Sequence, residues 1–337
     1  MKTKFSNCFF AKSAIWTAAL ACAALWAWSV AAAPQATSTA PAASKAPAPA
    51  VAPTLQAQKR FDTPQKAADA LVRAAADFNV AQLMDIFGPD GHDIVFSGEF
   101  AQDRQHATDF AKEAREKMSV SVDPKSSRRA FVLVGNEDWP FPVTLVQASG
   151  KWYFDSRAGQ QELMYRRIGA NELDAIDICH GYVEAQYDYA MRQRTLYDVN
   201  QYAQRIVSTP GTEDGLAWKD SSGKWDGPIG ENIAKAIEQG YTPTSDPYHG
   251  YFFKILKGQG PAAPLGQIDY VVKGIMIGGF ALVAAPAEYG VTGVRSFIVS
   301  QDGVVYEKDL GPQTLDEFAK MDRFNPDNSW SPVEDTP

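Results

Sequence analysis

Apolar residues recur at helical spacing soon after residue 60. Thr63 followed by Pro64 is typical of a helix start, because a threonine side chain caps free N–H groups and a proline fits the first turn. The apolar positions that follow lie three or four residues apart, as on one face of a helix, and are Ala67, Leu71, Ala74 and Phe78. A second short apolar set ends at Gly88-Pro89, and a further helix is predicted over residues 107–118.

Short runs rich in apolar and aromatic residues after residue 130 predict strands. The runs are 130–134, 141–146 and 151–154, and Ser149-Gly150 predicts a turn between the last two. Helices followed by antiparallel strands indicate an α+β layer rather than a parallel sheet. The pattern therefore predicts one α+β unit over residues 58–160.

A second unit is predicted over residues 168–312. It begins with a helix over 170–194, whose apolar stripe is Leu173, Ile176, Val183, Tyr187 and Met191. An irregular region rich in glycine follows, and then a short helix over 229–239. The strands are predicted over 251–256, 268–272, 275–284, 294–299 and 304–308, with turns at Lys273-Gly274 and Asp302-Gly303. We expect an α+β protein of two units, each with helices packed on a mostly antiparallel sheet, and a loosely held tail over residues 313–337.

The N-terminus has the pattern of a secretory signal. Three lysines within residues 1–12 precede an apolar run from Ala14 to Val30 and the small residues at 31–33. We therefore expect residues 1–33 to be a cleaved signal peptide, which would place the mature chain in the periplasm or outside the cell. Two alternatives remain open. One is a retained membrane anchor, since the run approaches the roughly 20 residues that span a bilayer, and the other is a lipid anchor on Cys22.

Composition adds a linker and excludes one class of partner. Residues 34–57 are almost entirely Ala, Pro, Ser, Thr and Val, which is typical of an extended, solvated linker. The formal net charge of −8 over 337 residues becomes more negative without the lysines of the leader. Because no basic stretch able to neutralise phosphates follows the leader, we expect no nucleic-acid binding.

Cysteine usage excludes an internal disulfide in the mature chain. Cys8 and Cys22 lie in the leader, so that Cys179 alone remains. The adjacent His180 is a poor partner for a nucleophilic thiol, because neighbouring residues on a helix point about 100° apart. We therefore expect Cys179 to be a packed thiol.

Several segments resemble one known family. They are Tyr248 to Leu256, Gly278 to Gly290 and Gln301 to Gly311 in the second unit, and Asn136 to Pro142 and Gly150 to Asp155 in the first. Together they resemble the exported bacterial family called Domain of Unknown Function 2950, over about residues 60–312. The resemblance implies export and no established activity. Lys273-Gly274 stands where this family would have Asn-Gly, a difference that should leave the turn intact.

Two weaker likenesses concern the fold alone. The first unit is similar to the cone-shaped α+β fold of nuclear-transport-factor-like proteins, whose curved sheet wraps a pocket. The second unit, a long helix followed by antiparallel strands, is similar to the globular head of type IV pilin-like proteins. The leader lacks a prepilin-type processing site, so assembly into a pilus would not follow. Fold likeness does not establish function.

The histidines are the first candidates for acid/base chemistry, and Glu288 with Asp302 or Glu307 is a further one whose pairing no spacing fixes. His92, His106, His180 and His249 have no spacing typical of a metal site, and the chain has no glycine-rich phosphate loop, so we expect neither a metal nor a cofactor. His92 and His106, which lie near aspartates, are weak catalytic candidates for a pocket in the first unit. The alternative for both is a solvated surface position.

Residues at loops and strand ends are weak candidates for binding. Aromatic side chains around an imidazole can form a ligand-binding face, and loops after long apolar strands often hold functional groups. The candidates are Trp139, Tyr248, His249, Tyr251, Glu288 and Tyr289. The alternative for the aromatic residues is core packing, and for Glu288 and Tyr289 it is turn formation.

The sequence favours a non-enzymatic protein over an enzyme. The leading hypothesis is an exported binding or assembly module of the cell envelope whose partner is an envelope protein or a cell-wall component. It would contact a membrane only through a retained leader or a lipid anchor. The alternative is a small-molecule pocket protein, or an enzyme, that uses the cone of the first unit. A structural role in envelope assembly is a third possibility.

Overall fold

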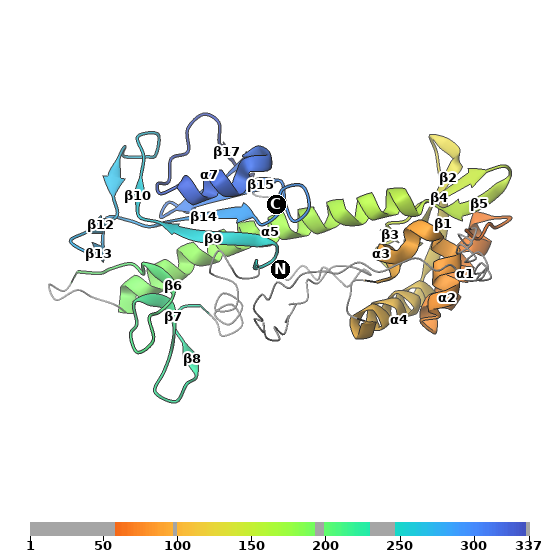
Figure 1. Ribbon diagram of the computed structural model, residues 1–337, viewed down its shortest axis with the longest axis horizontal. Helices are drawn as coiled ribbons and strands as arrows, with labels where there is room; N and C mark the ends of the chain where they lie inside the picture. Colours follow the sequence, from red (N-terminus) through yellow and green to blue (C-terminus); the bar gives the residue numbers. More distant parts are fainter. Residues whose placement is uncertain (1–57, 97–99, 193–198, 230–246, 335–337) are drawn as a thin grey trace, which may run out of the picture.

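Two lobes share one long helix. The computed structural model describes residues 58–96, 100–192, 199–229 and 247–334. Helix α5 (Ser156–Arg192) has 37 residues, which corresponds to about 55 Å at 1.5 Å per residue, and it runs from one lobe into the other (Figure 1). The predicted leader and linker lie outside the described residues, and so does the predicted helix over 229–239 apart from Ile229.

The first unit begins with helices. They are α1 (Pro64–Ala76), α2 (Val80–Phe87), the 3-10 turn η1 (Pro89–Gly91), α3 (His92–Val95) and α4 (Phe100–Glu116). Thr63 caps α1 as the sequence predicts, because its side chain accepts from the backbone N–H of Lys66 at 3.2 Å. Asn79 caps α2 in the same way. Local capping chemistry therefore sets both helix starts.

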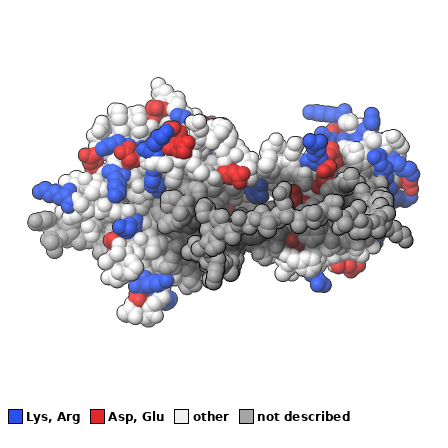
Figure 2. All heavy atoms as spheres, in the orientation of Figure 1, with Lys and Arg blue, Asp and Glu red and all other residues white. Residues whose placement is uncertain are grey.

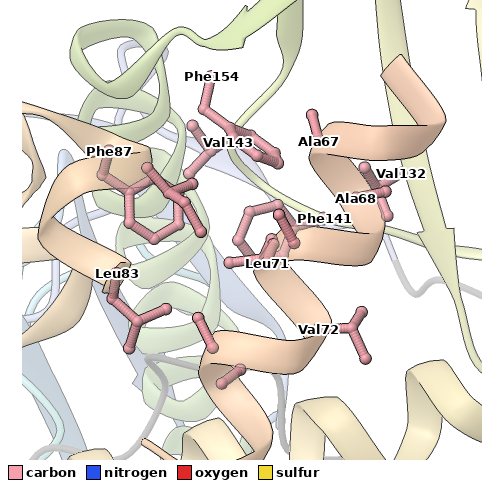
Figure 3. Packing of buried hydrophobic residues seen from close by; sticks show 14 of the residues in the cluster. Ala67, Ala68, Leu71, Val72, Leu83, Phe87, Val132, Phe141, Val143 and Phe154 are labelled. Atoms are coloured by element: carbon pink, nitrogen blue, oxygen red, sulfur yellow. The ribbon is translucent and has the colours of Figure 1, made fainter. Parts of the chain in front are cut away.

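An antiparallel sheet completes this unit. Its strands are β1 (Met118–Asp123), β2 (Ser126–Val134), β3 (Trp139–Pro140), β4 (Leu145–Ala148) and β5 (Lys151–Phe154), in the order β1-β2-β4-β5 with β3 on β2. Ser149 and Gly150 both have positive φ and form the predicted turn between β4 and β5. The core contains Leu71, Phe87, Phe141 and Phe154, whose side chains meet between the helices and the sheet (Figure 3).

The second unit is built on the other part of α5. Three short strands come first: β6 (Arg205–Val207), β7 (Gly215–Lys219) and β8 (Trp225–Asp226). The main sheet contains β9 (Tyr251–Leu256), β14 (Ala281–Pro286), β15 (Arg295–Ser300), β16 (Val305–Asp309) and β17 (Ser331–Pro332), in the antiparallel order β17-β16-β15-β14-β9. Two small ladders lie between β9 and β14: β10 (Gly258–Gln259) with β11 (Ile268–Asp269), and β12 (Val271–Val272) with β13 (Ile275–Met276).

The prediction of an α+β protein with antiparallel sheets is confirmed. The turn at Lys273-Gly274 joins β12 to β13, and both residues have the positive φ that a tight hairpin needs. The turn at Asp302-Gly303 joins β15 to β16. None of the described helices is both long enough and apolar enough to cross a membrane.

Several boundaries differ from the prediction. In the first unit α4 and β2 begin earlier than predicted, β4 begins later, and β1 lies where no strand is predicted. Helix α5 starts at Ser156 rather than near residue 170, because its polar first part has no apolar periodicity to reveal it. The predicted strand 275–284 is divided into β13 and β14 at Gly279, whose φ is 137°. The region predicted as irregular contains β6, β7 and β8, of which β6 pairs with β7 in parallel and β7 with β8 antiparallel.

The prediction of a loosely held tail is wrong. Helix α7 (Thr314–Lys320) contacts β14, and β17 pairs with β16 as the edge strand of the main sheet. Phe324 is fully buried, and its backbone exchanges hydrogen bonds with Gly258 and Gly260. The polar sequence concealed this packing, because a single buried aromatic residue is enough to attach the segment.

The tail should therefore contribute to stability. Replacing Phe324 with alanine should lower the free energy of unfolding by about 3–5 kcal/mol, because a buried aromatic ring leaves a cavity. Urea unfolding followed by circular dichroism measures this change. The matched control is Leu315→Ala on exposed α7, which should change it by less than about 0.5 kcal/mol. Equally small effects of both substitutions would contradict the packed tail.

Candidate functional site

Two loops of the second unit meet over the middle of α5. The loop that precedes β9 contains Tyr248 and His249, and the loop between β14 and β15 contains Glu288 and Tyr289. The carbonyl of Gly250 accepts from the N–H of Ala287 at 2.9 Å and so joins the two loops. Together with Asp174 of α5, these four side chains form what we call the loop-end surface: Asp174, Tyr248, His249, Glu288 and Tyr289.

His249 is held by a carboxylate of the helix. Its Nδ1 lies 2.5 Å from Oδ2 of Asp174, and both side chains are a little under half exposed. The backbone of His249 has a φ of 48°, a left-handed conformation that is uncommon for residues other than glycine. The ring of Tyr248 lies edge-on to the imidazole at 4.3 Å between centroids. The imidazole is therefore oriented, and its Nδ1 is occupied.

The other loop is fixed by side chains of α5 and by its own backbone. Asn171 donates to the carbonyl of Thr292 at 2.8 Å, and Glu172 accepts from the N–H groups of Val294 and Arg295 at 2.9 and 3.0 Å. Thr292 in turn accepts at its hydroxyl from the N–H of Glu288. These contacts leave the carboxylate of Glu288 at the exposed tip of the loop.

The tyrosines of this surface are neutral hydrogen-bonding groups. The hydroxyl of Tyr289 donates to Asp309 at 3.2 Å, and this bond to a carboxylate raises the pKa of Tyr289. Burial raises the pKa of Tyr248, and the charge of Asp174 raises it further. Both phenols therefore stay protonated at neutral pH, so the surface presents hydroxyl groups, an imidazole and carboxylates.

A comparison with known families identifies the family of this chain. A family model described as "Protein of unknown function (DUF2950)" matches residues 58–333. The chain belongs to this family. No curated protein matches the chain, and no solved structure matches it either. The likenesses to nuclear-transport-factor-like and pilin-like folds therefore stay predictions, while the DUF2950 assignment confirms the resemblance of the sequence segments.

One binding candidate of this DUF2950 chain belongs to the core. Tyr251 is buried, its hydroxyl donates to the carbonyl of Arg295 at 2.8 Å, and burial raises its pKa well above the usual range. A Cβ on Gly293 would approach its hydroxyl to 2.2 Å, so the tyrosine fills the space under the loop. The interpretation of Tyr251 as a binding residue is therefore wrong, because its position in β9 points it to the buried face.

Trp139 is not part of the loop-end surface. It lies on β3 in the first unit and is partly exposed, and the guanidinium of Arg166 covers its ring at 5.2 Å. Arg166 also donates to the carbonyl of Pro140 and pairs with Glu162. These contacts attach β3 to the first part of α5. The surroundings of Trp139 therefore favour a packing role over a binding role.

The histidines of the first unit lie on separate helices. His92 is exposed on α3, where its Nδ1 lies 3.0 Å from Asp93 and its ring lies 5.2 Å from that of Phe96. His106 is on α4, and its Nδ1 is buried without a hydrogen-bond partner. Within the described ranges the two imidazoles share no hydrogen-bond partner, and no group of three or more His, Cys, Asp and Glu side chains is placed to hold a metal ion.

Sequence reasoning missed Asp174, Asn171 and Glu172. They lie more than 70 residues before the loops that they hold. They lie on a helix that the sequence predicts from its apolar stripe. Nothing in the neighbouring sequence marks these three residues as functional. The predicted stripe could not have revealed Asn171, which is buried on another face of α5 together with Ala175 and Gln186. The prediction of the stripe is itself wrong in part, because Leu173, Tyr187 and Met191 are exposed.

The conformation of His249 yields a first test of this site. His249→Gly should be more stable than His249→Val by about 1–2 kcal/mol, because a β-branched residue resists a φ of 48° and glycine does not. Loss of the imidazole and its surface ion pair is common to both variants and therefore cancels. Thermal unfolding measures the difference. A valine variant as stable as the glycine variant would contradict the left-handed conformation.

Cys179 yields a second test. The thiol is buried on α5, and burial raises its pKa to about 12. In the chain without its leader, iodoacetamide at pH 8 should leave native Cys179 unmodified and should alkylate it fully in urea, as mass spectrometry would show. Rapid alkylation of the folded protein would mean that the thiol is accessible and ionised.

Proposed function

We propose that this DUF2950 protein is an exported, non-enzymatic binding module of the cell envelope, and that its loop-end surface contacts another envelope component. The partner would be an envelope protein or a cell-wall component. The mature chain would act in the periplasm or outside the cell. The observation that carries the proposal is the convergence of Tyr248, His249, Glu288 and Tyr289 from two separate loops.

The loop-end surface has the properties of a preformed contact surface. Its loops are held by side chains of α5, and His249 and Gly290 have positive φ values that the surrounding hydrogen bonds maintain. Preformed loops lose little conformational entropy when they bind a partner. The exposed groups are polar and few in kind, which favours a hydrogen-bonding partner over an apolar one.

The arrangement supports binding better than catalysis. The polar groups around His249 are already engaged in hydrogen bonds within the protein. Glu172 accepts from two backbone N–H groups, and Tyr289 donates to Asp309. An acid/base mechanism would need a second reactive group within hydrogen-bond reach of the substrate. In the first unit, apolar side chains fill the space between α1, α2 and β5 (Figure 3). A small-molecule pocket or an active site in the cone of the first unit therefore stays the alternative function. No contact among the described residues of that unit supports it.

Site-specific photocrosslinking tests the proposal. Benzoylphenylalanine in place of Tyr289 should give a discrete adduct in intact cells, and the same crosslinker in place of Leu315 on α7 serves as the matched exposed control. Cosedimentation of the chain without its leader with purified cell-wall sacculi tests the second kind of partner.

A variant of the loop-end surface tests whether binding depends on its side chains. The substitution Glu288→Gln, at the exposed tip of the loop, should reduce the adduct or the cosedimentation at least fivefold, with an unchanged thermal midpoint of unfolding. An adduct equally strong at Leu315, or no adduct together with no cosedimentation, would show that the loop-end surface does not bind an envelope component.

A further inference from the structure

The sheet of the first unit has one face without a helix on it in the part of the chain that the structure describes. Ala130, Val132 and Phe154 point to the core, where α1, α2 and α4 pack. Side chains alternate along a strand, so the intervening residues point to the opposite face. That face carries Arg129 and Phe131 of β2, Val146 of β4, and Lys151 and Tyr153 of β5.

A row of side chains crosses this face from one strand to the next. Arg129 is in register with Val146, and Val146 is in register with Tyr153. Beyond β5, the guanidinium of Arg60 lies over the ring of Tyr153 at 4.8 Å. Two arginines therefore flank a valine and a tyrosine on this face. We call Arg60, Arg129, Lys151 and Tyr153 the basic sheet face.

The neighbouring groups add to the positive charge. Arg128 donates to the carbonyl of Gln147 beside the row, and Lys125 is exposed in the turn between β1 and β2. Asp62 pairs with both Lys66 and Lys151, and these two lysines lower the pKa of its carboxyl to about 2. Figure 2 shows several Lys and Arg at this end of the first unit, with Asp and Glu among them.

This face stands out because the whole chain is acidic, with a formal charge of −8. The sequence offered no sign of it, since its charges come from residues 60, 129 and 151 and meet only in the folded sheet. The expectation that no basic patch would occur after the leader is therefore wrong for the folded chain.

We propose that the basic sheet face docks on a bilayer surface that carries anionic phospholipid headgroups. Arginine forms paired hydrogen bonds to phosphate oxygens. Tyrosine is enriched at the level of lipid headgroups, where its ring is half-buried and its hydroxyl is wet. Each basic residue near an anionic membrane strengthens the attraction.

The described chain enters the first unit next to this face. Gln58, the first described residue, donates to the carbonyls of Phe154 and Ile86, so the chain joins the first unit at β5, next to Arg60. The predicted linker thus ends at the basic sheet face. This inference goes beyond the proposed function, because it concerns the other unit and shares no residue with the loop-end surface.

Vesicle cosedimentation tests this inference. The chain from residue 34 on keeps every described residue and lacks the apolar leader, which would bind vesicles by itself. It should bind vesicles of phosphatidylglycerol and phosphatidylethanolamine at low salt, and not vesicles of phosphatidylcholine. Binding should weaken at least tenfold when salt is raised from about 50 to 300 mM, because screening shortens the reach of the charges.

Paired variants locate the contact. Arg60→Gln with Arg129→Gln should weaken binding to the anionic vesicles about tenfold or more. Lys224→Gln with Lys320→Gln removes the same charge from exposed positions of the second unit and should leave binding unchanged. Circular dichroism and thermal unfolding confirm that both variants fold.

Three results would overturn the inference. They are equal binding to neutral vesicles, equal losses from both pairs of substitutions, and binding to the soluble polyanion heparin without binding to anionic vesicles. The last result would assign the basic sheet face to an anionic polymer instead. None of them bears on the loop-end surface, so failure here is distinguishable from failure of the proposed function.

Discussion

Buried polar side chains on one face of α5 determine where the segments of the second unit lie. Gln186 is fully buried and both donates to and accepts from the backbone of Ala203, at 2.8 Å each. Farther along the helix, Tyr182 donates to Ala281 at the start of β14 and Asn171 donates to Thr292. A buried polar group left without a partner costs about 1–3 kcal/mol. Each segment is therefore held at one position along the helix.

The loop-end surface is a consequence of this attachment. Because Asn171 and Glu172 hold the loop between β14 and β15, and Asp174 holds His249, three neighbouring positions of one helix bring together two loops. Rigid attachment also maintains the left-handed backbone of His249, which would relax in an isolated loop. Such strain at an exposed residue is consistent with a contact surface that is formed before a partner arrives.

The same helix separates two surfaces of different chemistry. The first unit carries the basic sheet face, while the loop-end surface of the second unit presents carboxylates, hydroxyl groups and one imidazole. Because α5 is one continuous helix, the chain between the two units adds no flexible hinge within the described residues 156–192. The two surfaces therefore belong to different units joined by one helix.

Local chemistry in the sequence determined much of the fold. The cap at Thr63, the turns at Ser149-Gly150 and Lys273-Gly274, and the α+β class all follow from preferences that act within a few residues. Four of the binding candidates could be found because they flank strands, where loops begin. The tertiary structure decided the rest, namely the partner of His249, the burial of Tyr251 and Phe324, and the basic sheet face. These depend on which residues meet across distances of tens to more than a hundred positions, and local backbone preferences carry no information about such pairs.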